Sequence, residues 1–330
     1  MLIDDWANHA VRTHAVYKEF KAGRSYSLKI EYYQWLDLNE IHFGWGLYKD
    51  EIKEAAVKLA KESDAAVVCV GFDKTSEQEA SDRPFALPDY QIELINEVSK
   101  VNKNTIVVLT AGGSVDAMSW IKNVPAFIHA IYSGQNGGLA LAEILFGDVN
   151  PSGHLPFTYE KRWEDNPSFT YYHTSNENES KYTEGIFMGY RGFERNKTEP
   201  LFPFGYGLSY TTFEYSNLKI QKKGNNVLLN FSVKNSGKRE GKEVAQVYVS
   251  DKHCSVERPL KELKAFKKVS LKPGESTNIS IELKQDAFAF YDIVSKAWKV
   301  EPGYFEILVG SSSSDIKLRV NVNVTPAKSR

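Results

Sequence analysis

Four ionisable residues that could carry proton-transfer chemistry lie close together in one short stretch of the sequence. They are Glu77, Glu79, Asp82 and Arg83. The apolar run over 65–72 precedes them and is typical of a buried parallel strand. An amphipathic pattern that begins near Pro88 follows them and predicts a helix. Such a loop would lie at the edge where open α/β sheets bind ligands, and its carboxyl groups could exchange protons there. The alternative is a solvated acidic loop.

Strands and helices alternate on both sides of this loop. We expect helices over 48–63, 88–99 and 139–146, and further strands over 105–110 and 124–132. Alternation of this kind favours right-handed βαβ units and a parallel sheet. The fold class of this part is therefore α/β.

Glycine-rich loops follow two of these strands, at 111–114 and 133–138. Neither contains the dinucleotide-binding or phosphate-binding pattern, so we interpret the glycines as residues that permit tight turns. The sequence also lacks a cluster of metal ligands, and we expect no cofactor and no metal site.

The last third of the chain predicts an all-β domain. Residues 162–215 have little periodicity and many aromatic side chains, whereas strict alternation begins after Phe213. Short strands separated by turn signals predict an immunoglobulin-like sandwich over roughly 214–325. We expect these side chains to face its core: Val227, Leu229, Phe231, Val233, Val247 and Val249. The clusters of lysine and glutamate in this region are interpreted as solvated faces.

The composition excludes several classes of partner. The 330 residues carry a formal net charge of −1, and no basic patch indicates nucleic acid or an anionic membrane. No apolar run approaches the roughly 20 residues of a membrane span, and the first residues do not resemble a signal peptide. The compartment stays undetermined. Cys69, in the apolar strand, and Cys254 are not expected to form a disulfide.

The order of residues in the acidic loop resembles the second domain of glycoside hydrolase family 3, the β-glucosidase family. A glutamate, two small or polar residues, Asp-Arg, then Leu-Pro and a helix make up the pattern. Further stretches resemble the same family, namely 134–138, 147–156, 184–191 and 200–211. In the second of these, His154 stands where the family has a basic residue, and we interpret it as a structural turn residue.

The resemblance implies a role for one glutamate. Counted back from Asp82 and Arg83, the catalytic acid/base of the family falls on Glu79, with Glu77 as the fallback. We expect Glu79, and not Glu77, to point to a cleft at the edge of the sheet. Asp82 and Arg83 are interpreted as residues that brace the loop. The sequence departs from the family pattern at 80–81, where glycine and an aromatic residue are common.

The resemblance also implies a domain organisation. Residues 1–48 resemble the C-terminal part of a protective-antigen-like β-sandwich, with strands over 2–6 and 27–33 and a turn at 22–24. Residues 49–205 resemble the α/β sandwich domain of family 3. Residues 206–330 resemble its fibronectin type III-like domain. Because half a sandwich leaves an uncovered face and an unpaired edge, we expect that Met1 is not the natural start of a whole enzyme.

Retaining glycoside hydrolysis needs two carboxyl groups about 5–5.5 Å apart. In the family, the nucleophilic aspartate lies on an N-terminal (β/α)8 barrel that these 330 residues do not resemble. The implied function is to supply the acid/base of an exo-acting β-glucosidase-type hydrolase that cleaves a β-linked oligosaccharide or glycoside. We expect the chain alone to be inactive. The alternative is a non-catalytic carbohydrate-binding or structural fragment.

Overall fold

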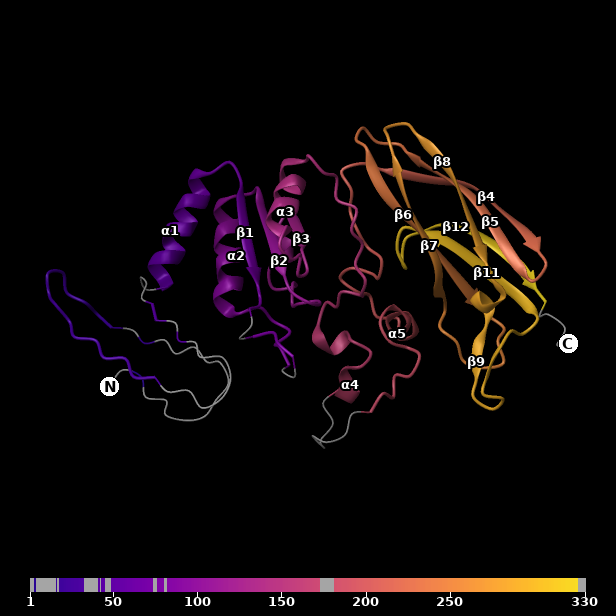
Figure 1. Ribbon diagram of the computed structural model, residues 1–330, viewed down its shortest axis with the longest axis horizontal. Helices are drawn as coiled ribbons and strands as arrows, with labels where there is room; N and C mark the ends of the chain where they lie inside the picture. Colours follow the sequence, from indigo (N-terminus) through magenta and orange to yellow (C-terminus); the bar gives the residue numbers. More distant parts are fainter. Residues whose placement is uncertain are drawn as a thin grey trace. The chain divides into compact units, whose positions relative to one another are not determined.

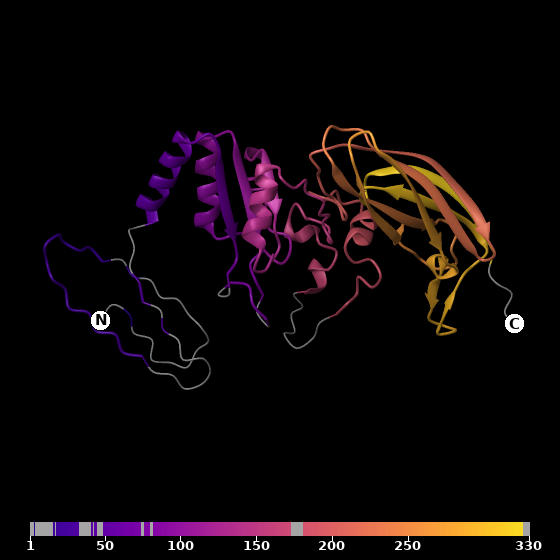
Figure 2. The same ribbon diagram turned by 45° about the horizontal axis from the view of Figure 1, so that its top comes forward.

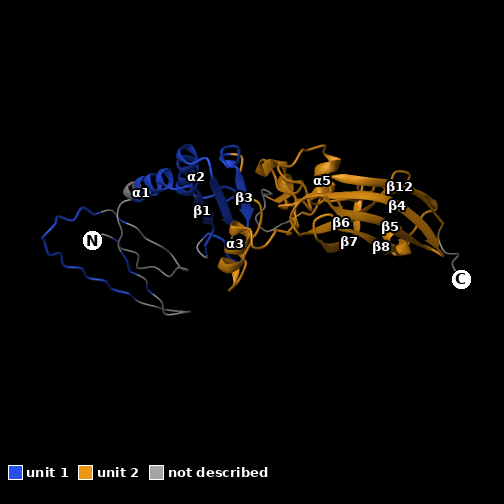
Figure 3. Cartoon of the chain, turned by 90° about the horizontal axis from the view of Figure 1, so that it is seen from above, with its two compact units in different colours: residues 1–111, 119–129 blue, residues 112–118, 130–330 orange. Residues whose placement is uncertain are grey.

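The computed structural model describes residues 3, 16, 18–32, 41, 43–44, 49–73, 76–79, 82–172 and 181–325. The chain divides into two compact units (Figure 3). The first contains residues 1–111 and 119–129, and the second contains 112–118 and 130–330. Within the described residues, no helix is long and apolar enough to cross a membrane.

The described N-terminal residues confirm only part of the prediction. The turn at 22–24 forms, and the Arg24 amide donates to the Lys21 carbonyl at 3.2 Å. Residues 27–32 form no strand, so the strand predicted over 27–33 is wrong for them. The apolar side chains of Leu28 and Ile30 are 57% and 48% exposed, and no described layer covers them. The strand predicted over 2–6 lies almost wholly outside the described residues.

The first unit contains a three-stranded parallel sheet in the order β1-β2-β3 (Figures 1 and 2). The strands are β1 (Ala66–Gly71), β2 (Thr105–Thr110) and β3 (Ala126–His129). Its helices are α1 (Lys49–Glu62) and α2 (Asp89–Val101), and a 3-10 turn spans Ile121–Asn123. Helix α2 packs against β1 and β2, and α1 packs against α2. The predicted strand–helix alternation is confirmed.

Burial differs between the central strand and the edge strand. Most positions of β2 are buried on both faces, as in parallel sheets generally. In β1, Val68 and Val70 are buried, but Val67 and Cys69 are exposed. The prediction of a fully buried strand is therefore wrong for one face of β1. The reason is its position, because β1 is an edge strand of the sheet that the structure describes.

The second unit contains α3 (Gly137–Phe146), α4 (Phe169–Tyr172), α5 (Tyr190–Arg195) and a β-sandwich (Figure 1). One sheet has the order β12-β11-β6-β7 and the other β4-β5-β8, all antiparallel. The bounds are β4 (Phe213–Lys223), β5 (Asn226–Asn235), β6 (Gly241–Asp251), β7 (Glu262–Leu271), β8 (Ser276–Leu283), β11 (Gly303–Gly310) and β12 (Ile316–Val324). A hairpin of β9 (Phe290–Asp292) and β10 (Ala297–Lys299) projects from it, and 3-10 turns span Trp163–Asp165 and Gln285–Phe288.

Alternation along β5 fixes the core between the two sheets. Its side chains at 227, 229, 231 and 233 are at most 3% exposed and form one apolar cluster with Val247 and Val249. All six predicted core positions are thus confirmed. Because successive side chains of a strand point to opposite faces, a register shift of one residue would expose the whole set.

An aromatic segment covers the outer face of the larger sheet, where the sequence has little periodicity. Tyr190 of α5 packs with Tyr248 of β6 and Leu308 of β11 in a separate apolar cluster. The Tyr190 ring stacks on Phe204 with the centroids 5.0 Å apart. The Gln246 side-chain amide donates to the Gly205 carbonyl at 3.1 Å. Both faces of β6 are therefore buried over 245–250, where the polar Gln246 is accommodated by its hydrogen bonds.

One asparagine joins the turn after α3 to the sandwich. The Asn150 side-chain nitrogen donates to the Glu240 carbonyl at 2.9 Å. Its oxygen accepts the Tyr210 amide at 2.8 Å and the Ser209 hydroxyl at 3.0 Å. The Tyr210 hydroxyl then donates to the Ile144 carbonyl at the end of α3. These bonds belong to the second unit and fix the stretches that resemble family 3 against one another.

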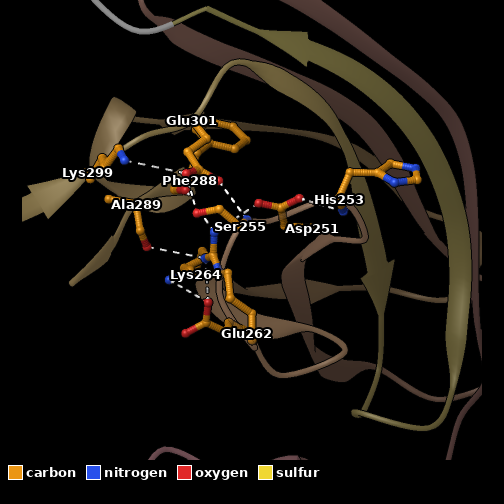
Figure 4. A network of polar contacts seen from close by, with 10 residues as sticks. Asp251, His253, Ser255, Glu262, Lys264, Phe288, Ala289, Lys299 and Glu301 are labelled. Carbon is orange, nitrogen blue, oxygen red and sulfur yellow. Dashed lines mark hydrogen bonds and ion pairs between the residues drawn. The ribbon is translucent and has the colours of Figure 1, made fainter. Parts of the chain in front are cut away.

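A buried arginine, Arg258, organises one end of the sandwich, and its partners Asp251, Glu262, Phe288 and Ala289 are labelled in Figure 4. The Arg258 side chain is 5% exposed, and its guanidinium contacts Asp251 at 3.3 Å and Glu262 at 2.7 Å. It also donates to the carbonyls of Phe288 and Ala289 at 3.1 and 3.2 Å. Burial acts to raise the pKa of Glu262, but the bond from Arg258 and the nearby cations hold it below its ordinary value.

The interpretation of the lysine and glutamate clusters as solvated faces is wrong here. The side chains of Lys261, Glu262 and Lys264 are only 14–17% exposed. Lys261 pairs with Glu194 of α5, and Arg191 of α5 lies 3.6 Å from Glu262. Each charge can be buried because an opposite charge compensates it.

We predict that Arg258→Met lowers the free energy of unfolding by about 3–5 kcal/mol, because it removes the guanidinium that pairs with the buried Asp251 carboxylate and with Glu262. Urea denaturation followed by circular dichroism measures this. Arg319→Met is the matched control, since Arg319 is 61% exposed and its pair with Glu306 is worth at most about 1 kcal/mol.

The pH dependence of the free energy of unfolding tests the same network in a second way. The pKa of Glu262 is lower in the folded protein than in the unfolded chain, so ionised Glu262 stabilises the fold at any pH above its unfolded-state pKa. This stabilisation is lost as the pH falls through the pKa of Glu262 in the folded state. Between pH 7 and pH 4, Arg258→Met should therefore lose less stability than the wild type. Equal losses in both proteins would contradict this account.

Candidate active site

The acidic loop begins where β1 ends, and a side chain of α2 holds this point. The Gln91 oxygen accepts the Gly71 amide at 2.9 Å, and the Gln91 nitrogen donates to the Gly71 carbonyl at 2.9 Å. Gln91 thus pairs with β1 as a neighbouring strand would. Gln91 was not among the residues predicted from the sequence, although Gln91, Ile95 and Val98 share one face of α2. A polar residue on an apolar stripe is the signal that could have identified it.

Gly71 is required at this position by a close approach of two strands. A Cβ atom on Gly71 would lie 2.1 Å from the Thr110 carbonyl oxygen. The next amide, of Phe72, donates to that same oxygen at 3.2 Å. Any larger residue would push β1 away from β2 and move the start of the loop.

Two local contacts shape the first turn of the loop. The Ser76 hydroxyl donates to the Asp73 carboxylate at 3.1 Å, and the amides of Ser76 and Glu77 donate to the Asp73 carbonyl. Serine and aspartate favour such turns because their side chains bond to the nearby backbone. The turn brings Glu77 back toward the sheet.

Arg83 braces the far side of the loop, as predicted. Its Nε donates to Glu77 at 3.1 Å, and its Nη1 donates to the Pro84 carbonyl at 3.1 Å. The guanidinium also lies over the Phe72 ring, 4.9 Å from the centroid. The Glu77 and Arg83 side chains are 22% and 17% exposed, so this ion pair is shielded from solvent.

Glu79 differs from Glu77 in its surroundings. Glu79 is exposed, and within the described part of the chain its carboxylate has no hydrogen-bond or ion-pair partner. Asp82 is also exposed. The structure therefore brings Glu77 and Arg83 together and leaves Glu79 at the surface of the loop.

An open hollow of about 510 Å³ lies beside the end of β1. Gly71, Phe72, Asp73 and Gln91 contribute to its lining, and neither glutamate of the loop is among its described lining residues. The expectation that Glu79 points to a cleft stays a prediction.

A histidine lies at the same edge of the sheet, at the end of β3. The His129 Nε2 is 3.1 Å from the Ala111 carbonyl oxygen, to which its N–H can donate. Burial lowers the pKa of His129, although this bond acts in the opposite direction. The ring is therefore neutral at pH 7 and holds the end of β2 beside β3.

Two further ionisable residues, His154 and Glu160, are enclosed by other parts of the second unit. Burial lowers the pKa of His154, and its ring lies close to Gly207, which fits a structural role, although the structure has no turn at 151–155. Glu160 is 6% exposed and accepts bonds from Ser114 and from Asn166, the latter at 2.6 Å. No local pattern in the sequence distinguishes Glu160 from an exposed glutamate.

Comparison with known proteins assigns the chain to a family. Residues 7–210 match the family described as glycosyl hydrolase family 3 C-terminal domain, and residues 243–313 match the fibronectin type III-like domain. The chain belongs to the glycosyl hydrolase family 3 C-terminal domain family. This confirms the resemblance found in the acidic loop and in the stretches that follow it.

Individual family 3 relatives agree over most of the chain. This chain is 45% identical over 280 residues to the thermostable beta-glucosidase B of Acetivibrio thermocellus. The aligned region covers 83% of this chain and 37% of that protein. This chain is 38% identical over 273 residues to an exo-alpha-(1->6)-L-arabinopyranosidase of Bifidobacterium breve, covering 82% and 36% of the two chains. The chain thus spans just over a third of the length of these relatives.

A solved structure of the family has the same fold. The beta-glucosidase of Kluyveromyces marxianus in complex with glucose superposes with a TM-score of 0.82 at 36% identity. The match covers 86% of this chain and 34% of that one. The predicted fold class of this family 3 chain, a parallel-sheet α/β part followed by an antiparallel sandwich, is therefore confirmed. The boundaries at 48/49 and 205/206 stay predictions.

We predict that Gln91→Leu weakens the end of β1, because it removes both bonds to Gly71. The expected cost is about 1–3 kcal/mol of local stability. Hydrogen exchange of the Gly71 amide should become faster, while exchange in β5 should not change. Gln135→Leu, at an exposed loop position, is the matched control. Unchanged exchange at Gly71 would show that the Gln91 contacts do not hold the strand.

Proposed function

We propose that this chain supplies the general acid/base, Glu79, of a retaining, exo-acting β-glucosidase-type glycoside hydrolase. The observation that carries the proposal is the contrast between the two glutamates of the loop. Arg83 forms an ion pair with Glu77, while Glu79 has no partner within the described residues. Glu79 also lies within the part of the chain that matches the family 3 C-terminal domain. Asp82 keeps its proposed role in bracing the loop beside Arg83.

The proposed chemistry needs a carboxyl group that changes its protonation state twice in each turnover. In the first step, Glu79 donates a proton to the glycosidic oxygen as the bond to the anomeric carbon breaks. In the second step, Glu79 accepts a proton from the water that attacks the glycosyl-enzyme intermediate. The Glu77 carboxylate is engaged by the Arg83 guanidinium at 3.1 Å, so this ion pair would have to break before Glu77 could reach a substrate oxygen. This argues for Glu79 rather than Glu77.

The nucleophile of the proposed reaction comes from outside these 330 residues. We propose that it lies on an N-terminal barrel domain that combines with this chain. Several large apolar side chains of the second unit are exposed, and we propose that they take part in the surface that meets this domain. Those within 163–210 are Trp163, Tyr172, Tyr182, Ile186, Met188, Leu208 and Tyr210.

The substrate class is proposed from the relatives. Relatives of this chain bear the names of a beta-glucosidase and an arabinopyranosidase, and the Kluyveromyces marxianus structure is a complex with glucose. We propose a β-linked oligosaccharide or glycoside with a neutral sugar at its non-reducing end. The sugar that would fill the glycone position contacts mainly the barrel, so this chain leaves its identity open.

We predict that Glu79→Ala slows the cleavage of glycosides with poor leaving groups by about 10²–10⁴-fold, since these need a proton from the acid. The assay uses a chimaera in which the N-terminal portion of the Acetivibrio thermocellus relative precedes this chain. Activated aryl glycosides should lose less activity, and azide should restore part of it. Glu77→Ala is the matched comparison. Equal losses on both substrate types, or a larger loss in Glu77→Ala, would reassign the acid.

We predict that the 330-residue chain alone does not hydrolyse aryl β-glucosides or aryl β-xylosides. Without an opposed nucleophile no glycosyl-enzyme forms, and the orientation of the sugar, which can be worth about 7–11 kcal/mol, is lost. Adding the barrel domain in trans should produce turnover that depends on Glu79. Turnover by the chain alone that Glu79→Ala abolishes would refute the proposal and indicate a second carboxylate, such as Asp73 or Asp82. No turnover with any barrel would favour a non-catalytic role.

A further inference from the structure

His129 connects two strand ends at the edge of the sheet from which the acidic loop emerges. It is the last residue of β3 and lies in register with Leu109 of β2. Its Nε2–H donates to the Ala111 carbonyl at 3.1 Å, because a carbonyl oxygen can only accept. The ring is half-buried and lies edge-on to Phe127, with the centroids 6.4 Å apart. His129 therefore helps to fix the position in which β2 ends.

The end of β2 in turn holds the start of the acidic loop. The Thr110 carbonyl accepts the Phe72 amide at 3.2 Å. The Arg83 guanidinium lies over the Phe72 ring, 4.9 Å from its centroid, and Arg83 also pairs with Glu77 at 3.1 Å. Contacts therefore run from His129 through the end of β2 to the ion pair that braces the loop.

The charges of that ion pair also act on the imidazole ring. Burial is the main cause that lowers the pKa of His129, and the bond to the Ala111 carbonyl acts against it. The positive charge of Arg83 lowers this pKa further, and the negative charge of Glu77 raises it by less. The end of β2, residues 109–111, adds no ionisable side chain. Because coupling between two sites is reciprocal, a proton on His129 disfavours the position of Arg83 as much as Arg83 disfavours that proton.

On the basis of the proposed function, in which this loop carries the acid/base, we propose that His129 is a positioning residue whose uncharged ring is required for Arg83 to hold Glu77 in place. The neutral ring donates to β2 and adds no charge beside the guanidinium. A protonated ring adds a second cation that acts on Arg83.

The direction of the pH effect follows from the lowered pKa of His129. Its value in the folded protein lies below the ordinary value of about 6.5 that the unfolded chain has. The neutral ring therefore stabilises this arrangement above the unfolded-state pKa, and the stabilisation is lost as the pH falls through the pKa of His129 in the folded state. Acid should thus loosen the brace of the loop.

The first test follows the Arg83 Nε–H resonance of the 330-residue chain by NMR between pH 7 and pH 4. We expect a shift of this resonance in step with the protonation of His129, and we expect this step to disappear in His129→Gln, which keeps an N–H donor but cannot be charged. Arg83→Gln should raise the pKa of His129. Arg162→Gln, at an exposed arginine of the second unit, is the matched control and should leave it unchanged. The proposal is overturned if the step persists in His129→Gln, or if the pKa of His129 is the same with and without Arg83.

The second test measures kcat/KM against pH for an aryl β-glucoside in the chimaera with the N-terminal portion of the Acetivibrio thermocellus relative. His129→Leu loses the bond to Ala111 and should lower kcat/KM at pH 7 by about three- to tenfold. His129→Gln should lower it by less and should keep a larger fraction of its pH 7 value at pH 5 than the wild type does. His154→Gln, at the half-buried histidine of the second unit, should not change the shape of the profile. Profiles of the same shape in His129→Gln and the wild type would overturn the proposal.

Failure of the proposed acid/base role gives a different result from failure of this positioning role. If Glu79 is not the acid/base, Glu79→Ala keeps its activity in the chimaera, while the coupling between Arg83 and His129 in the 330-residue chain is unaffected. If His129 does not position the loop, the coupling is absent, while Glu79→Ala still slows the cleavage of poor leaving groups.

Discussion

A buried positive charge must find its compensation inside the protein, and the second unit depends on this constraint at Arg258. The guanidinium receives partners from β6, from β7 and from the backbone just before β9. Glu262 extends the network to Arg191, and the adjacent Lys261 extends it to Glu194, so α5 is attached to the sandwich by charge as well as by aromatic packing. Desolvation makes each of these charges costly alone, and therefore none can move without the others.

This constraint also explains what the sequence could and could not predict. Alternation identified the side chains of β5 because period-two burial is a local property of a strand. The stretch from Arg258 to Leu263 has no such period, and its charges look like those of a solvated face. Their burial depends on Glu194 and Arg191, which lie more than 60 residues earlier in the chain. Only the folded arrangement shows that these charges meet.

The acidic loop shows the same division between local and non-local information. The turn at Asp73 and Ser76 and the brace from Arg83 involve residues within about ten positions, and the ability of an arginine to pair with a nearby carboxylate predicted the brace. The exposure of Cys69 depends instead on where β1 lies in the sheet, and the apolar run alone could not reveal it. The contact from Gln91 lies between these cases, because the helix that carries it was predicted, whereas its bonds to Gly71 were not.

The proposed acid/base role gives these contacts a common consequence. A proton donor that must also become a proton acceptor needs a fixed backbone and a carboxyl group whose charge is not already compensated. Gln91 and Gly71 fix the start of the loop. Arg83 fixes the end of the loop through its ion pair with Glu77. Because Arg83 is satisfied by Glu77, it does not need to pair with Glu79. We therefore propose that Glu77 acts as a positioning residue, whose ion pair with Arg83 leaves Glu79 available for proton transfer.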